Sequence, residues 1–462
     1  MQKPQHFRRS MAEIGVIAAF LLAPVWLRFG DFLPFFSRLY VTRFVLFIPL
    51  IWTIFWWLLA GAPGIRKFAE SKLRALWLGV LLLLVIWSFL SQSWAFVRVQ
   101  HPEVAATAAL QFGTAILFAA ALACLQVPPA KVISALVFGL VWNSLLTLLQ
   151  ARAGGAIGLT ALGECPYNAL TPGISIVRAG EITFVRPFGL LPHVNLLAGF
   201  LMVSLLAAAS WLVSERRWRR ILATCILPLG LYALLLTFSR AAWGGVFFGG
   251  CLLLLFGWRK LRQRQMLILA AITVAICVIV AIVFVSQYGD LLSARVGTGE
   301  EGIEMRSISD RIVFMEYALK AIGQAPLTGF GIGNFPWRAS FYLQFTFYDL
   351  RGDNVHHVFL LAWSELGTPG MIMLGIAVLS GFFAAVRMIR ATHNMYRIAL
   401  ASTFVALAAV GWLDHYPYTL LHFQVLWWGC IAAALSPPRN PALSATPADL
   451  SPNTLTEAKI PV

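Results

Sequence analysis

Long apolar runs separated by polar loops make up most of this chain. Runs of about 18 residues or more recur from one end to the other, and each is long enough to cross the hydrocarbon core of a bilayer as a helix. We therefore predict an all-α integral membrane protein with about twelve transmembrane helices. Their approximate positions are 11–29, 39–60, 74–95, 104–126, 131–152, 189–213, 219–239, 241–258, 266–288, 356–386, 396–414 and 418–436.

The composition agrees with this pattern and excludes an ordinary soluble domain. Hydrophobic residues make up 60% of the 462 positions and charged residues only 12%. One large soluble core would need far more polar surface to cover it. The first apolar run follows the basic residues Lys3, Arg8 and Arg9, and no small-residue cleavage site comes after it. We expect an uncleaved first span rather than a signal peptide.

Basic clusters occupy alternate loops, at 66–74, 216–220, 259–264 and 387–397. The positive-inside rule places these loops and both termini in the cytoplasm. The predicted organisation has four parts. They are helices 1–9 within 1–288, which include a periplasmic loop at 153–188, then a large periplasmic loop with short helices at 289–355, helices 10–12 at 356–436, and a disordered Pro-rich cytoplasmic tail at 437–462.

The opposite, periplasmic side carries arginine almost to the exclusion of lysine, with Lys320 the one lysine there. A sidedness rule does not distinguish the two cations, whereas planar, bidentate binding of phosphate favours arginine. The net charge of +16 then has two sources, cytoplasmic anchoring to anionic lipid and an external arginine cluster, and we expect no nucleic-acid partner. The external arginines are Arg152, Arg178, Arg186, Arg240, Arg295, Arg306, Arg311, Arg338 and Arg351.

Within the large loop, residues 309–323 have the pattern of a short amphipathic helix. Ser309 is a suitable N-cap, and the apolar face would contain Ile312, Met315, Leu319 and Ile322. Five of the six cysteines fall in apolar runs, Cys165 has no loop partner, and no CxxC pair occurs. These features predict neither a disulfide framework nor a zinc site, and no metal or other cofactor is expected.

Four segments on the periplasmic side carry residues suited to chemistry, at 186–195, 237–245, 354–370 and 413–422. Arginines suit an anion and histidines suit proton transfer, so their conjunction indicates a site. Beyond Arg186 and Arg240, the candidate side chains in these segments are His193, Asn195, Ser239, His356, His357, Glu365, Asp414, His415 and His422.

Each candidate also has a structural interpretation. Arg240 is placed where a cationic side chain extends from a helix end to the membrane surface, and Arg186 has Glu181 as a nearby pairing partner. A histidine at the end of a helix usually has a structural role and is held by hydrogen bonds. His356 and His357 are adjacent and so point about 100° apart on a helix, which means that at most one of them faces a given site.

At these residues the chain resembles the O-antigen ligase/polymerase superfamily of membrane glycosyltransferases. TFSRAAWGG (237–245) resembles the family's Ser-Arg junction between two spans, and PLTGFGIGNF (326–335) resembles a glycine-rich turn of its periplasmic loop. Arg186 and Leu190 fit an Arg-x-x-x-Leu element. His356, a polar residue, nine further residues and Gly367-x-x-Gly370 fit the ligase pattern, although His357 stands where Asn, Ser or Gln is usual.

The resemblance implies a GT-C-like membrane fold and a metal-independent, inverting glycosyltransferase in the bacterial inner membrane, with a periplasmic active site. Arg186, Arg240 and Arg311 would bind the diphosphate of an undecaprenyl-diphosphate-linked glycan donor. His356 would be the catalytic base, with Ser239, His193, Asn195, His357, Glu365, Asp414 and His415 in support.

The acceptor stays open among lipid A–core (ligase), a growing glycan chain (polymerase) and a protein hydroxyl (oligosaccharyltransferase), and the motifs favour the ligase. A transporter or flippase also suits twelve spans. Proton-coupled transport usually places ionisable residues at mid-membrane, and here Glu365 is the one carboxylate expected at that depth. A non-catalytic scaffold of polysaccharide assembly is the third class of function.

Overall fold

The computed structural model describes residues 2–28, 45–296, 302–344 and 352–438, and these parts are almost wholly helical. One two-stranded antiparallel hairpin, β1 (Ile176–Ala179) with β2 (Ile182–Val185), pairs Ile176 with Val185. The 3₁₀ turns are η4 (Ser91–Trp94), η5 (Thr160–Leu162) and η6 (Ser210–Val213). The helices are α1 (Gln2–Leu22), α2 (Phe47–Leu59), α3 (Ile65–Ala69), α4 (Lys72–Leu90), α5 (Pro102–Leu125), α6 (Pro129–Ala153), α7 (Val194–Ala209), α8 (Arg217–Leu236), α9 (Arg240–Leu261), α10 (Arg264–Val296), α11 (Gly302–Gln324), α12 (Phe335–Leu343), α13 (Val358–Thr392), α14 (Met395–Val410), α15 (Tyr416–Thr419) and α16 (Leu421–Leu435).

Eight helices of the described chain are long and apolar enough to cross a membrane, namely α4 with η4, α5 to α10, and α13. Helices α2, α14 and α16 are apolar but shorter, and α1 overlaps the first predicted span. The predicted all-α membrane fold is therefore confirmed, and a helix lies in each of the twelve predicted positions. The start of the second span (39–44), Arg351 and most of the predicted tail (439–462) lie outside the described residues.

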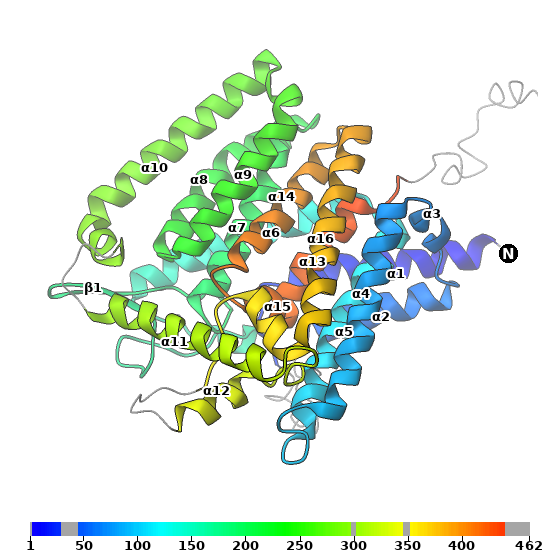
Figure 1. The fold of residues 1–462 in the computed structure, drawn as a ribbon. Coiled ribbons are helices and arrows are strands. Elements are labelled where there is room, and N and C mark those ends of the chain that lie inside the picture. Colours follow the sequence, from blue (N-terminus) through cyan, green and yellow to red (C-terminus); the bar gives the residue numbers. More distant parts are fainter. Residues whose placement is uncertain (1, 29–44, 297–301, 345–351, 439–462) are drawn as a thin grey trace, which may run out of the picture.

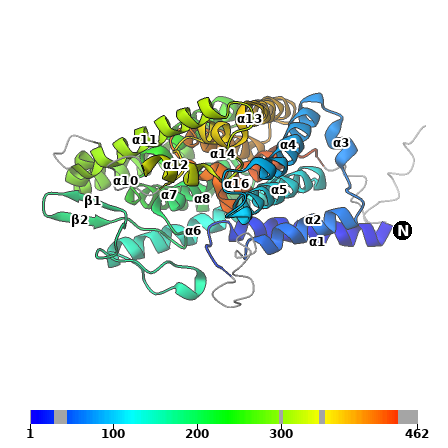
Figure 2. The same ribbon diagram turned by 60° about the horizontal axis from the view of Figure 1, so that its bottom comes forward.

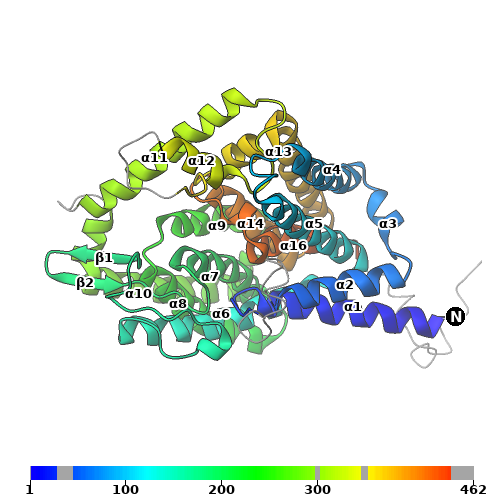
Figure 3. The same cartoon turned by 90° about the horizontal axis from the view of Figure 1, so that it is seen from below.

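Helices α14 and α16 form the centre of the bundle (Figures 1 and 3). They pack against each other, with α9 and α7 against α14 on one side and α5 and α13 against α16 on the other. Every residue of α16 is buried. On the outside, α10 leaves Val274, Ile279 and Ile282 about three-fifths exposed, at 61%, 59% and 62%. An apolar face of that size belongs in contact with lipid.

A sharp reversal joins α8 to α9 and presents Arg240. Phe238 adopts φ +50°, a left-handed conformation that costs free energy in a residue with a side chain. Its fully buried ring packs on Phe184 of β2 (ring centroids 5.5 Å apart) and on Phe284 of α10 (5.3 Å). The aromatic contacts therefore fix the junction, the hairpin and α10 against one another.

Helices α11 and α12 lie across one end of the bundle (Figure 2). Arg338 of α12 sits over the rings of Phe96, Phe330, Phe341 and Tyr342 at 4.7–4.9 Å, and its Nη2 donates to Gln324 Oε1 at 2.6 Å. Cation–π contacts of this kind stabilise local packing. Arg338, one of the external arginines, is thus a structural residue of this layer.

The amphipathic helix predicted at 309–323 is present, but two of its details are wrong. Helix α11 begins at Gly302, so Ser309 lies inside the helix and is not its N-cap. The packed face contains Phe314, Ala318, Ala321 and Ile322, whereas Ile312, Met315 and Leu319 stay exposed. The sequence could not show which elements α11 packs on, and these are α13 and α12.

Gly367 breaks α13 and lets the glycine-rich turn approach it. It has φ +67° and ψ −175°, a conformation open essentially to glycine alone. A Cβ there would lie 2.2 Å from the carbonyl oxygen of Leu327, and a Cβ on Gly329 would lie 2.4 Å from the carbonyl oxygen of Glu365. The two backbones can lie this close only because both residues are glycine.

Gly367→Ala should therefore destabilise the protein by about 1–3 kcal/mol or more, because a Cβ adds both strain and a clash. Gly375→Ala is the matched control, since Gly375 lies on the same helix with no atom near its Cβ position. Thermal unfolding of the detergent-solubilised variants measures both. Equal melting temperatures for the two would contradict this role of Gly367.

Candidate active site

Three arginines converge on the α8–α9 junction. Arg186, 4% exposed, donates from Nε to the carbonyl oxygen of Thr237 at 2.6 Å. Arg240, the first residue of α9, donates from Nη1 to the carbonyl oxygen of Arg295 at 2.8 Å. Arg295 in turn donates from Nε to the carbonyl oxygen of Phe238 at 3.2 Å. Two backbone carbonyls of the chain reversal and one in the last turn of α10 thus hold the three guanidinium groups in place.

The surroundings of Arg186 are strongly electropositive. Burial, followed by the charges of Arg295, Arg240 and Arg311, lowers the pKa of Arg186 well below its ordinary value. Among the described residues its side chain hydrogen-bonds to neutral groups, the Thr237 carbonyl and the Asn195 amide. A buried cation is costly without a counter-charge, and three further cations add to that cost. An anion that contacts this cluster would offset both the cost of burying Arg186 and the repulsion between the arginines.

A polar chain leads from this cluster to two histidines. Arg186 Nη2 donates to Asn195 Oδ1 at 3.3 Å, and Asn195 Nδ2 donates to Asp414 Oδ2 at 3.1 Å. The other oxygen of Asp414, Oδ1, accepts from the backbone N–H of His415 at 2.8 Å and lies 3.4 Å from His356 Nδ1. One amide therefore bridges the cationic group and a buried carboxylate.

Asp414 is ionised in this setting. Burial by itself raises its pKa, but the contact with His356 and the charges of His415, His356 and His193 outweigh burial and hold the Asp414 pKa well below its usual range. Burial is also the largest influence on His415 and lowers its pKa. The rings of His356 and His415 lie 5.1 Å apart, with Asp414 beside both. A carboxylate beside Nδ1 of His356 orients that ring, as in other carboxylate–histidine pairs.

The remaining candidates have structural contacts. His193 caps α7, because its Nδ1 accepts from the N–H of Asn195 at 3.2 Å, and it thereby orients Asn195. His357 caps α13 by accepting from the N–H of Leu360 at 3.3 Å, and its ring packs on Trp412. Of the two adjacent histidines, His356 is therefore the one that faces Asp414, although His357 departs from the family motif.

Glu365 lies apart from the arginine group, whereas Ser239 lies at the α8–α9 junction itself. Glu365 is 1% exposed, and its carboxylate accepts from the N–H of Phe335 at 3.3 Å, which fixes the end of the glycine-rich turn. Ser239 is buried at the N-cap of α9 without a side-chain capping bond. Arg311 of α11 adds charge to the environment of Arg186 and His415.

Arg295 belongs with the arginine group, and sequence reasoning did not separate it from the other external arginines. Helix α10 continues past a kink at Tyr288 to Val296, beyond the predicted end at 288, and this extension carries Arg295 back to the junction. The sequence Phe-Ser-Arg at 238–240 marks Arg240. No local pattern in the sequence marks Arg295.

His356, Asp414 and His415 also form the kind of group that can bind a metal ion. Their ligand atoms all lie within 4.8 Å of one another. The charge of Arg311 reaches His415 in this group and opposes the binding of a cation. The contacts among these three residues also suit proton transfer. That the protein works without a metal ion stays a prediction.

Residues 223–375 match the family model described as O-antigen ligase. This domain match supports membership of the O-antigen ligase superfamily. This match contains Arg240, Arg311 and His356, whereas Arg186 and Asp414 lie outside it. The comparison with curated proteins found no match. The match supports a ligase- or polymerase-type glycosyltransferase with glycan and lipid-linked substrates. Together with the apolar helices, it also supports a multi-pass membrane protein.

Asp414→Asn should lower the stability of the protein by about 1–3 kcal/mol at pH 7, because it removes the charge that two histidines and Asn195 share. The depressed pKa of Asp414 means that its contribution is complete above the ordinary carboxyl pKa of about 4 and declines as the pH falls below that value. Unfolding followed from pH 7 to pH 3 tests this, with the exposed Asp290→Asn as control. A difference from wild type that widens on acidification would contradict the assignment.

Proposed function

We propose that the protein transfers a glycan from undecaprenyl diphosphate to a hydroxyl group at the periplasmic face of the bacterial inner membrane, as an O-antigen ligase that acts on lipid A–core. The observation that carries this proposal is the contact chain from Arg186 through Asn195 to Asp414 and His356. It joins a cluster suited to a diphosphate with a pair suited to taking a proton, and the family match points to the same chemistry.

The diphosphate of the donor binds Arg186, Arg240 and Arg311, and Arg295 adds its charge. Arginine forms bidentate hydrogen bonds with phosphate oxygens, and a buried cluster strengthens them. As the bond between the anomeric carbon and the phosphate oxygen breaks, its electron pair passes to the diphosphate. The guanidinium groups stabilise that growing charge. Arg240 lies at the end of a membrane helix because its ligand is a lipid diphosphate at headgroup depth.

His356 removes the proton of the acceptor hydroxyl. Asp414 holds Nδ1, which leaves Nε2 to act as the general base. The acceptor oxygen bonds to the anomeric carbon on the face opposite the diphosphate, so the configuration inverts. The products are a new glycoside and undecaprenyl diphosphate, and the proton on His356 passes to water. No metal is needed in this scheme, because the arginines neutralise the leaving group.

A polymerase uses the same donor and the same steps, with a growing glycan as acceptor in place of lipid A–core, and a protein hydroxyl is the third acceptor. A proton-coupled transporter is the more distant alternative. It needs a relay across the membrane, whereas the Arg–Asn–Asp–His chain is built on the helix junctions and termini around 186–195, 237–240, 356 and 414.

Transfer in detergent-solubilised protein tests the proposal. With a lipid-linked glycan donor, lipid A–core and EDTA, wild type should form glycan-capped product. Arg186→Ala, Arg240→Ala and His356→Ala should each lower the rate about a hundredfold or more. Two matched controls, Arg178→Ala on the exposed hairpin and His357→Asn at the α13 cap, should stay within about tenfold of wild type.

Each other outcome has a defined meaning. Polymer formed from the donor alone would show that the chemistry holds and that the acceptor is a growing glycan. Variants as active as wild type would refute the assigned roles of the arginines and His356.

A further inference from the structure

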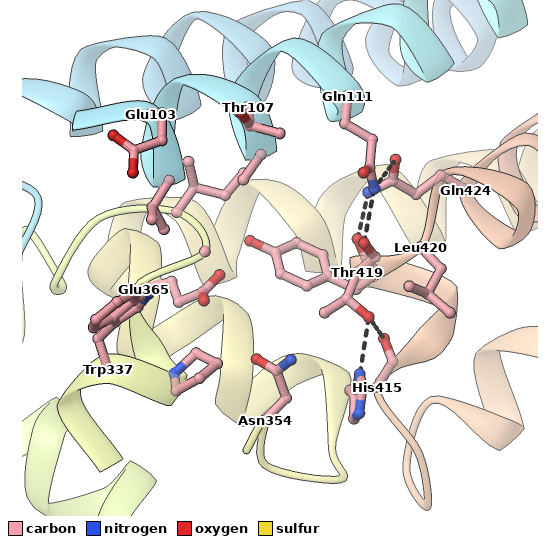
Figure 4. A pocket seen from close by; sticks show the side chains of 16 residues that line it. Glu103, Thr107, Gln111, Trp337, Asn354, Glu365, His415, Thr419, Leu420 and Gln424 are labelled. Carbon is pink, nitrogen blue, oxygen red and sulfur yellow. Dashed lines mark hydrogen bonds between the residues drawn. The ribbon is translucent and has the colours of Figure 1, made fainter. Parts of the chain in front are cut away.

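A cavity of about 430 Å³ is lined in part by His415 (Figure 4). Its walls lie on elements other than those that carry the arginine group. Its walls come from α5, from the glycine-rich turn with α12, and from α13, α15 and α16. The volume falls within the roughly 300–1,000 Å³ of typical small-molecule sites. The donor diphosphate binds on the arginine side, and this cavity is a separate place for a second substrate.

His415 connects the cavity to the catalytic pair. It lines the cavity together with Asn354, two residues before His356. Its Nδ1 pairs with Thr419 Oγ1 at 2.8 Å, and its ring lies 5.1 Å from that of His356. A molecule in the cavity would therefore present its end to the group that removes a proton.

The lining suits a neutral molecule with many hydroxyl groups. It contains the carboxylates of Glu103 and Glu365, the amides of Gln111 and Gln424, and the aromatic side chains of Trp337 and Tyr418, while none of the lining residues is lysine or arginine. Carboxylates and amides bind hydroxyls, and aromatic rings pack on the C–H faces of a sugar. A phosphate is disfavoured by the acidic groups, and an acyl chain would leave the polar groups without partners.

The polar groups of the lining are also held in place before any ligand binds. Gln111 Nε2 donates to the carbonyl oxygen of Thr419 at 2.7 Å and to Gln424 Oε1 at 3.3 Å, which ties α5 to the start of α16 (Figure 4). Trp337 stacks on His101 with ring centroids 4.5 Å apart. Ordering such side chains in advance lowers the cost of binding.

We propose that this cavity binds the terminal sugar of the acceptor and directs its hydroxyl to His356. The proposal rests on the function proposed above and adds the place where the acceptor binds. The donor then approaches from the arginine side and the acceptor from the α5–α12 side, with His356, Asp414 and His415 between them. This arrangement also fits inversion, because the two substrates meet from opposite sides.

The test uses two lipid-linked sugars that carry a photoactivatable diazirine on the terminal sugar. One is lipid A–core, and the other is an undecaprenyl-diphosphate-linked repeat labelled at its non-reducing end. Each is cross-linked to purified full-length protein, and the labelled peptides are mapped by mass spectrometry. Thr107→Trp fills the cavity, and Leu110→Trp, on the exposed face of the same helix, is the matched control.

We expect labelling within 102–111 or 335–337 by one of the two probes. Thr107→Trp should abolish it and Leu110→Trp should leave it unchanged. In the transfer assay, Thr107→Trp should raise the acceptor KM at least tenfold and leave the donor KM within twofold. Asn354→Leu, which adds little volume, should raise the acceptor KM about three- to tenfold, the value of one lost hydrogen bond. This second variant guards against misfolding of the first.

The outcomes separate the two proposals. Labelling elsewhere, or labelling that survives Thr107→Trp, overturns the acceptor cavity even if transfer occurs. Specific labelling of the cavity by a wild-type protein that transfers no glycan keeps the sugar site and overturns the proposed reaction. The probe that labels the cavity identifies the acceptor as lipid A–core or a growing glycan.

Discussion

A buried guanidinium group, that of Arg186, is the interaction on which the rest of this end of the bundle depends. It lies near three other arginines, so electrostatics alone would drive the group apart. The fold holds it together with backbone carbonyls of the α8–α9 junction, which require the left-handed Phe238, and Phe238 is held in turn by the rings of β2 and α10. The strain and the repulsion at this site are explained if an anion completes it.

Asn195 lies between the cationic and the anionic residues of the site. It accepts from Arg186 and donates to Asp414, so the cationic half and the ionised carboxylate stay connected without an ion pair that would neutralise both. The arginines keep their charge for a ligand. Asp414 keeps its charge for His356. Beyond the histidines lies a cavity lined without lysine or arginine, and the site thus passes from an anion-binding side to a side suited to neutral polyols.

Much of this arrangement could be predicted from the sequence. Length and hydropathy located the helices. The motifs singled out Arg240 at the start of α9, His356 just before α13 and Arg186 directly after β2. Gly367 was found through its motif, and the structure supplies the reason, a backbone contact that excludes any Cβ.

The rest depends on tertiary packing. Asp414 was separable from an ordinary turn residue only by its contact with His356, which lies just before α13. The place of Arg295 depends on the extension of α10 past a kink. Arg338, one of the external arginines, instead packs against four aromatic rings. The partner of α11 and the cavity between α5 and α12 have no local signature at all.

The most direct measurement is the binding of undecaprenyl diphosphate to the purified protein, by native mass spectrometry or calorimetry, in wild type and in an Arg186→Ala/Arg240→Ala double variant. Wild type should bind the diphosphate more tightly than undecaprenyl monophosphate, with an affinity that falls as salt rises. The double variant should lose that preference, whereas Arg178→Ala should keep it. Equal binding of both lipids by wild type and double variant would contradict a diphosphate site in this cluster.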